Sequence, residues 1–158
     1  AKSEPVFGGV YKLSALEYNG EIIPKIKVSE NVGKITIPGF KQVHRLYDKE
    51  TGKAIADVVT LHDEEIDNSK TYEIFHPIYT WKRKAVTNFY SKKLLVKIFD
   101  KGQSVYESPG IEEIKHYCFE QINTLWEEVL RFEKPHKYFV DLSKPLWDIK
   151  NRLLEEHK

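Results

Sequence analysis

The apolar residues change their spacing along the chain, and this change restricts the folds that the chain can adopt. Stretches 6–16, 22–28, 42–47 and 54–61 carry the Val, Ile and Tyr enrichment that is typical of half-buried strands. From residue 111 to residue 132, apolar residues recur at intervals of three and four, as on one buried face of a helix. Strands first and helices last predict an α+β fold.

Two turn sequences predict hairpins. The segment DKETG at 48–52 opens with Asp and closes with Gly, which is typical of a type I turn followed by a left-handed glycine. It is expected to pair strand 42–47 with strand 54–61. The aromatic-rich stretch 72–90 is expected to be extended, and DKGQ at 100–103 to join a second hairpin, 94–99 with 104–107.

Two helices are expected in the last third of the chain. The first is predicted to begin at Pro109, with Ser108 as its cap, and to end at Pro135. The second is predicted to start near Ser143 and to continue to the C-terminus. Their buried faces are expected to consist of Ile111, Ile114, Cys118, Ile122, Leu125, Val129 and Phe132, and of Leu146, Ile149 and Leu153.

The segment HDEEIDNSK at 62–70 is polar and acidic, and it interrupts the strand pattern. Such a segment is a candidate domain boundary. We therefore expect a strand-rich domain over residues 1–62 and an α+β tail domain over residues 70–158.

Composition excludes several classes of protein. The chain has 158 residues with 25 Lys plus Arg against 24 Asp plus Glu, a net charge of +1, without the broad positive field that nucleic-acid binding requires. No apolar run approaches the roughly 20 residues that span a bilayer, and the first residues do not resemble a signal peptide. The single cysteine excludes an intrachain disulfide and favours a reducing compartment, so a cytoplasmic location is expected.

The sequence contains none of the strong catalytic motifs: no G-x-S-x-G, no G-x-G-x-x-G, no P-loop and no H-E-x-x-H. Its six histidines show no metal-ligand spacing. We therefore predict no catalytic residue and no metal site on this chain. Cys118 is expected to be a small buried apolar residue rather than a nucleophile.

Two basic segments leave alternatives open. Segment 25–45 places five cations around two glycines, a mixture that holds phosphates, or else these are the solvated sides of strands and turns. In segment 75–84, basic residues alternate with aromatics and could stack on bases; the alternative is an exposed strand edge blunted by charge. The five cations of the first segment are Lys25, Lys27, Lys34, Lys41 and Arg45.

Short motifs occur in a fixed order along nearly the whole chain: FGGVYKL at 7–13, KVSEN at 27–31, PGFKQVHR at 38–45, FHP at 75–77, VYESP at 105–109 and VDLS at 140–143. In this order they resemble the C-terminal third of bacterial nicotinate phosphoribosyltransferases. Gly110 stands where members of that family usually carry Leu.

The resemblance implies a much larger enzyme. That family joins nicotinate to the ribose of phosphoribosyl diphosphate, hydrolyses ATP through a transient phosphohistidine, and makes nicotinate mononucleotide for NAD biosynthesis. It implies that residues 1–62 form the last barrel strand and a closing mixed domain. The phosphorylated histidine and the glycine-rich phosphate loop belong upstream of the FGG motif, so no catalytic residue is transferred to this chain.

Partners follow from the same resemblance. The full-length enzyme is expected to use Mg²⁺ and ATP, and this chain alone is expected to bind neither. The full-length enzyme is also expected to bind nicotinate and phosphoribosyl diphosphate and to form a homodimer. Nucleic acid and membrane are not expected partners. Lys34, Lys41 and Arg45 are the candidate phosphate-binding residues. The isolated chain is expected to be inactive. The alternative is a noncatalytic protein-binding or oligomerisation module that uses segment 75–84.

Overall fold

The computed structural model describes residues 9–157 and divides into two units. The larger unit comprises residues 41–147, and the smaller combines the chain up to residue 40 with the chain from residue 148 on. Residues 6–8 of the first expected strand lie outside the described residues. Each unit mixes strands and helix, and the α+β prediction is confirmed.

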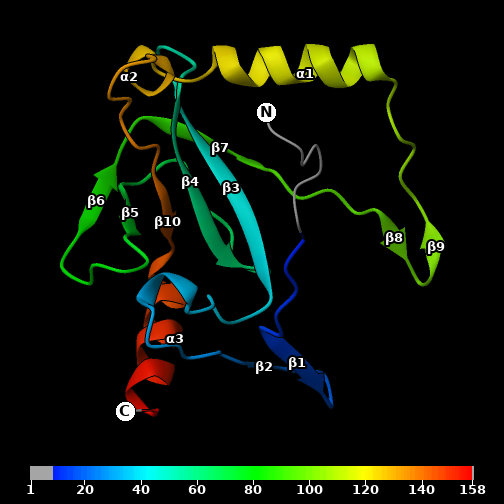
Figure 1. The fold of residues 1–158 in the computed structure, drawn as a ribbon, viewed down its shortest axis with the longest axis vertical. Helices are drawn as coiled ribbons and strands as arrows, with labels where there is room; N and C mark the ends of the chain where they lie inside the picture. Colours follow the sequence, from blue (N-terminus) through cyan, green and yellow to red (C-terminus); the bar gives the residue numbers. More distant parts are fainter. Residues whose placement is uncertain (1–8, 158) are drawn as a thin grey trace. The chain divides into compact units, whose positions relative to one another are not determined.

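A six-stranded sheet forms the larger unit, in the order β6-β5-β10-β4-β3-β7 (Figure 1). Neighbouring strands are antiparallel except β10 and β4, which are parallel. A separate short pair consists of β8 Phe99–Asp100 and β9 Gln103–Ser104. The strands of the main sheet are β3 Lys41–Asp48, β4 Ala54–Leu61, β5 Tyr72–Phe75, β6 Arg83–Val86, β7 Phe89–Lys93 and β10 Val140–Leu142.

The β3–β4 hairpin has the predicted turn. The Oδ1 atom of Asp48 accepts hydrogen bonds from the backbone N–H groups of Glu50 (3.0 Å) and Thr51 (2.7 Å) and from the Thr51 hydroxyl (2.8 Å). Gly52 closes the turn at φ +68°, in the left-handed region that glycine adopts without strain. These bonds to the carboxylate lower the pKa of Asp48.

Strand β10 was not expected, and it changes the domain division. It lies between β4 and β5 and pairs with both. Segment 62–70 is therefore a connection between two strands of one sheet, and the expected division into 1–62 and 70–158 does not coincide with the two units. A strand from the tail completes the sheet begun by the β3–β4 hairpin.

One face of the sheet is buried. Alternate residues of β4 are buried, as expected for a strand with one covered face. Phe89, the largest fully buried side chain, packs beside Tyr72 with ring centroids 6.3 Å apart. The core cluster consists of Leu46, Ala56, Val58, Ile66, Ile74, Val86 and Phe89.

The first predicted helix is shorter than expected. Helix α1 spans Ile111–Asn123 and the short α2 spans Glu127–Leu130. Gly110, not Ser108, is the N-cap, so the predicted start two residues earlier is wrong. Thr124 is the C-cap: its carbonyl accepts from the Ala54 N–H at 2.8 Å, while Lys53 Nζ binds the carbonyl of Asn123 at 2.8 Å. Because Lys53 and Ala54 bind carbonyls that a longer helix would use internally, the helix ends before Pro135.

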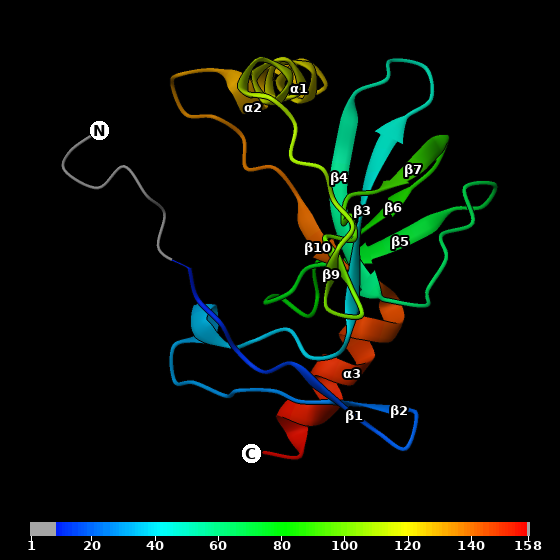
Figure 2. The same ribbon diagram turned by 90° about the vertical axis from the view of Figure 1, so that its right-hand side faces the viewer.

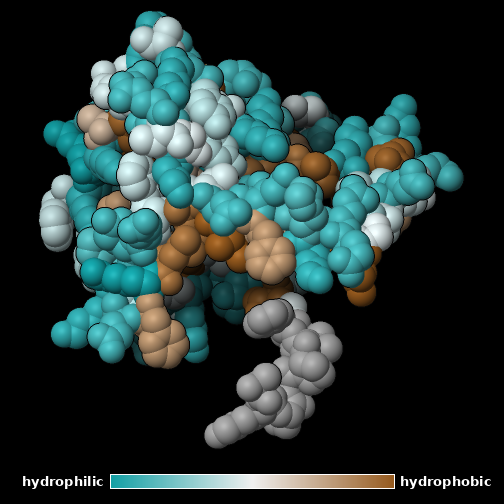
Figure 3. Space-filling view, turned by 90° about the horizontal axis from the view of Figure 1, so that it is seen from above, coloured by the Kyte–Doolittle hydropathy of each residue, from teal (hydrophilic) through white to brown (hydrophobic). Residues whose placement is uncertain are grey.

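The expected burial of α1 is also wrong. None of its residues is buried, and Ile111 is 79% exposed. Cys118, expected in a core, is exposed. In both ribbon views α1 lies near one end of the β3–β4 pair (Figure 1, Figure 2), and the view onto α1 shows apolar side chains exposed among hydrophilic ones (Figure 3).

The smaller unit contains a hairpin and part of a helix. Strands β1 Ala15–Tyr18 and β2 Glu21–Pro24 are joined by Asn19 and Gly20, both at positive φ, as in a type I′ turn. Helix α3 spans Lys144–Glu155, so it begins in the larger unit and continues into the smaller. The Ser143 Oγ accepts from the Leu146 N–H at 3.4 Å, consistent with the predicted start. In the described residues no helix is both long and apolar enough to cross a bilayer.

Candidate functional site

The three candidate phosphate-binding residues lie on two different elements. Lys34 ends the 3-10 helix η1 (Val32–Lys34) in the smaller unit, whereas Lys41 and Arg45 belong to β3 in the larger unit. Their grouping into one anion site therefore remains a prediction.

The η1 loop uses much of its polar capacity internally. The side-chain oxygen of Asn31 accepts from the Gly33 N–H at 3.0 Å, and the Thr36 hydroxyl accepts from the Lys27 N–H at 2.8 Å. The Lys12 ammonium donates to the Lys34 carbonyl at 3.4 Å, so two lysines meet at this loop. The Lys34 side chain is exposed, as an anion ligand at a surface loop would be.

Arg45 is held by a carboxylate. Its Nε and Nη2 bind the two oxygens of Asp57 at 2.7 and 2.9 Å, a bidentate arrangement. The Tyr138 hydroxyl donates to Asp57 at 3.0 Å, and Arg45 Nη1 donates to the Gln121 side chain of α1 at 3.3 Å. The hydrogen bonds that Arg45 donates to Asp57 raise the pKa of Arg45 despite partial burial, and burial raises the pKa of Tyr138.

The Arg45 network is consequently a structural junction between the sheet and α1. The side chains of Arg45 and Asp57 are 18% and 14% exposed, so their charges compensate each other with little solvent. An anion at Arg45 would have to compete with Asp57. Lys41, the first residue of β3, is partly buried, and this burial lowers its pKa.

Segment 75–84 combines exposed aromatic rings with a charged strand at the edge of the sheet, the two alternatives that the sequence left open. His76 Nδ1 accepts from the N–H groups of Ile78 and Tyr79, at 3.1 Å each, which fixes a tight turn. His76, Tyr79 and Trp81 form a row of rings with centroids 4.8 and 6.0 Å apart, and Trp81 is 79% exposed. The charged strand β6 that follows is the edge of the sheet.

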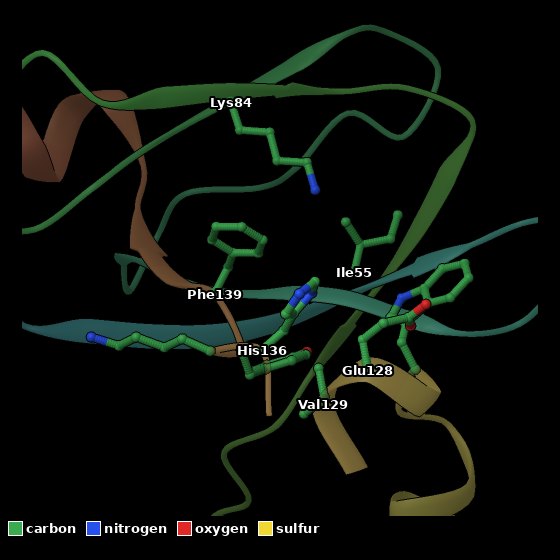
Figure 4. Close-up of a pocket in the computed structure, with 9 residues that line it drawn as sticks. Ile55, Lys84, Glu128, Val129, His136 and Phe139 are labelled. Atoms are coloured by element: carbon green, nitrogen blue, oxygen red, sulfur yellow. The ribbon is translucent and has the colours of Figure 1, made fainter. Parts of the chain in front are cut away.

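A cavity of about 210 Å³ lies on the larger unit where α2 faces the residues before β10 (Figure 4). Lys84 reaches toward it from β6, and Phe139, His136 and Glu128 contribute to its walls. The Lys84 ammonium lies 4.9 Å from the centroid of the Phe139 ring. We refer to this cavity as the Phe139 pocket. Sequence reasoning missed it, because its residues come from three segments far apart in the chain.

The family profile described as "Nicotinate phosphoribosyltransferase C-terminal domain" matches residues 40–150. The chain belongs to this family. The match covers the whole six-stranded sheet and both helices α1 and α2, so the resemblance seen in the ordered short motifs is confirmed.

Curated nicotinate phosphoribosyltransferases match beyond the profile. The enzyme of Bacillus subtilis is 40% identical over all of this chain, which covers 32% of that protein. That of Dictyostelium discoideum is 36% identical over 96% of this chain and 26% of the relative. The chain therefore spans about a third or less of the length of these relatives.

A solved structure supports the fold. The crystal structure of human nicotinic acid phosphoribosyltransferase matches 75% of this chain, and 24% of its own, with a TM-score of 0.67 at 24% sequence identity. The common fold of this C-terminal domain is thus a sheet-rich α+β arrangement.

Two of the network residues, with opposite charges, lie in the two strands of the predicted hairpin. The predicted strand ends, residues 47 and 54, place Arg45 opposite Ala56, whereas the observed register shifts by one residue between Leu46 and Tyr47 and pairs Arg45 with Asp57. Opposite charges facing each other across a hairpin predict an ion pair. No comparable signal pointed to Tyr138 or Gln121, which reach the network through the tail.

Proposed function

We propose that the chain acts as the C-terminal part of a nicotinate phosphoribosyltransferase, which forms nicotinate mononucleotide from nicotinate and phosphoribosyl diphosphate with ATP hydrolysis. The single observation that carries this proposal is 40% identity over the whole chain to the Bacillus subtilis enzyme. The chain alone is inactive in this proposal. The longer enzyme is cytoplasmic, works as a homodimer and has neither nucleic acid nor membrane as a partner.

The cofactors are assigned to the rest of the enzyme. The described residues contain no group of three or more His, Cys, Asp and Glu side chains that could hold a metal ion. Mg²⁺ would assist the departure of diphosphate by compensating its developing charge. In this proposal the chain contributes positioning, and a cation at the substrate phosphates if Lys34 or Lys41 reaches them.

The exposed apolar face of α1 supports the proposal that this chain functions as part of a longer protein. Ile114, Phe119 and Ile122 are all exposed on this helix. The matched relatives are about three times as long as this chain, so a large part of each could cover the face. We expect the catalytic part of the enzyme to pack there.

Grafting tests the proposal. The chain would replace the corresponding C-terminal segment of the Bacillus subtilis enzyme, and mononucleotide formation would be measured with nicotinate, phosphoribosyl diphosphate, ATP and Mg²⁺. We expect turnover by the graft, none by the truncated relative, and none by this chain alone. Turnover by the 158-residue chain alone would refute the proposal that the catalytic residues lie in the rest of the enzyme.

Lys41→Ala in the graft tests the phosphate assignment. We expect a higher KM for phosphoribosyl diphosphate with a smaller effect on nicotinate, because only the phosphates need the cation. Lys49→Ala, an exposed lysine on the β3–β4 turn, is the matched control.

The alternative function, a noncatalytic binding or oligomerisation module, is favoured by the exposed rings of Tyr79 and Trp81. Under this alternative, Trp81→Ala would abolish association without affecting the graft's KM.

A further inference from the structure

The Phe139 pocket has two walls that are tied together. The His136 N–H donates to the Glu128 carbonyl at 2.7 Å, which joins α2 to the segment that leads into β10. The third side is Lys84 on the edge strand β6. Because a backbone hydrogen bond joins two walls and a sheet strand provides the third, the cavity is built into the larger unit.

The lining is aromatic. Trp126 and Phe139 line the cavity and are 39% and 37% exposed, so part of each ring faces open space. Ile55 also lines the cavity (Figure 4). Ring faces of this kind attract a flat ring by offset or edge contacts.

The charge of the lining is positive. Lys84 and Lys137 line the cavity, against one carboxylate, Glu128. Within residues 9–157, the Lys84 ammonium rests against the Phe139 ring and forms no ion pair. Lys82 lies 5.9 Å from the same ring, outside the lining. An ammonium held over a ring without a carboxylate partner is available to an anion.

Asp141 is the neighbouring carboxylate that could compete for this ammonium. It lies on β10, two residues after Phe139 in the chain. It is 5% exposed, and burial raises its pKa, while His76, Lys82, Lys84 and Lys137 act in the opposite direction. Several cations thus share one buried carboxylate, which leaves positive charge uncompensated at the pocket.

We propose that the Phe139 pocket binds a single-ring aromatic anion, with its ring against Phe139 and its carboxylate or phosphate on the Lys84 ammonium. The cavity of about 210 Å³ is smaller than the roughly 300–1,000 Å³ of sites for drug-sized ligands, which restricts the ligand to one ring. The inference does not rest on the proposed function, because it concerns only residues of this chain and involves no turnover.

Benzoate is the probe, titrated into the 158-residue chain and followed by amide chemical shifts. Benzamide has the same ring without the charge, and cyclohexanecarboxylate has the charge without the aromatic ring. We expect saturable shifts around Phe139 and Lys84 with benzoate, and about tenfold or more weaker binding of both comparison compounds. Equal binding of the three, or no saturation by benzoate, would overturn the proposal.

Lys84→Gln is expected to weaken benzoate binding by about tenfold or more. Lys82→Gln is the matched control, because Lys82 approaches the same ring from outside the lining; it should leave the affinity within about threefold. Circular dichroism checks that both variants are folded. Phe139→Leu gives a second readout: benzoate should lose its preference over cyclohexanecarboxylate. Unchanged affinity in Lys84→Gln, or unchanged preference in Phe139→Leu, would contradict the assignment.

Discussion

The six-stranded sheet and helix α1 belong to the same unit but are packed in opposite ways. In the sheet, Leu46, Ile74 and Phe89 are fully buried. In α1, which has the apolar spacing of a core helix, no residue is buried. The sheet therefore satisfies its apolar pattern within the described residues, and α1 does not.

The attachment of α1 explains how this is possible. Its C-terminal end is held by polar bonds: Lys53 Nζ to the carbonyls of Asn123 and Leu125, at 2.8 and 3.1 Å, and Arg45 to Gln121. Burial of apolar area usually dominates helix docking. Here hydrogen bonds position the helix and leave its apolar face exposed. The apolar spacing in the sequence thus predicts that one face of the helix will be covered, but it does not identify what covers it.

The largest effect should separate the two regions directly. Phe89→Ala removes a fully buried ring from the sheet core, and we expect a loss of about 3–5 kcal/mol in the free energy of unfolding. Phe119→Ala makes the same chemical change on α1, where the ring is 57% exposed, and should cost no more than about 0.5 kcal/mol. Urea denaturation of both variants measures the difference. Comparable losses would mean that α1 is packed as tightly as the sheet.

A second prediction concerns the junction between the regions. Asp57→Ala leaves the Arg45 guanidinium and the Tyr138 hydroxyl without their shared acceptor, and we expect a loss of about 2 kcal/mol. Asp63→Ala, at an exposed carboxylate, is the control and should have little effect.

The double variant Arg45→Met with Asp57→Leu sharpens this result. It removes both charges and should recover part of the lost stability, because a matched apolar pair leaves no uncompensated charge. If the double variant had a lower free energy of unfolding than Asp57→Ala, the Arg45–Asp57 pair would stabilise the fold by more than the mutual neutralisation of its two charges.

The parts of this fold that the sequence predicted are those set by neighbours in the chain. The 48–52 turn was predicted because Asp48 and Gly52 carry its whole mechanism within five residues. The Arg45–Asp57 pair belongs to the same hairpin, although its register includes a shift between Leu46 and Tyr47 that was not predicted. Both depend on residues close in sequence.

The parts that the sequence did not predict depend on distant segments. Strand β10 has only three residues, and its place between β4 and β5 depends on pairing with strands far upstream. The end of α1 at Asn123 depends on Lys53 and the Ala54 N–H. The Phe139 pocket likewise combines three segments. Local propensity contains no information about such partners.

Acid should weaken the sheet through His44, because this histidine is buried, whereas the histidine of α1 is exposed. His44 is 2% exposed, and no partner binds its Nε2 among the described residues. Burial, assisted by the charge of Lys93, lowers its pKa below the ordinary 6.5, although Glu65 and Glu64 act the other way. The unfolded chain then binds more protons than the folded one, so stability is present above pH 6.5 and declines as the pH falls below it.

Unfolding free energies at pH 7 and at pH 5.5, compared for the unsubstituted chain and His44→Leu, measure this contribution. The variant should show a smaller decrease between the two pH values. His116 on α1 is 76% exposed in its side chain and provides the control, since His116→Leu should leave the decrease unchanged. An identical decrease in all three proteins would show that His44 titrates normally.

The smallest effect tests whether the β8–β9 pair, which precedes α1 in the chain, unfolds together with the sheet. Gly52 in the β3–β4 turn and Gly102 in the β8–β9 turn have φ of +68° and +80°, and neither has an atom within 4 Å of an added Cβ. Alanine therefore introduces the same backbone strain at both positions, about 1 kcal/mol, and no clash.

Gly52→Ala should lower the global free energy of unfolding by that amount, because the hairpin is part of the core sheet. Gly102→Ala should change it by less than about 0.5 kcal/mol, because strain in a two-residue strand pair with exposed side chains is relieved by local opening. Hydrogen exchange would show that opening as faster exchange confined to residues near the β8–β9 turn. Equal losses for both variants would show that the β8–β9 pair unfolds cooperatively with the six-stranded sheet.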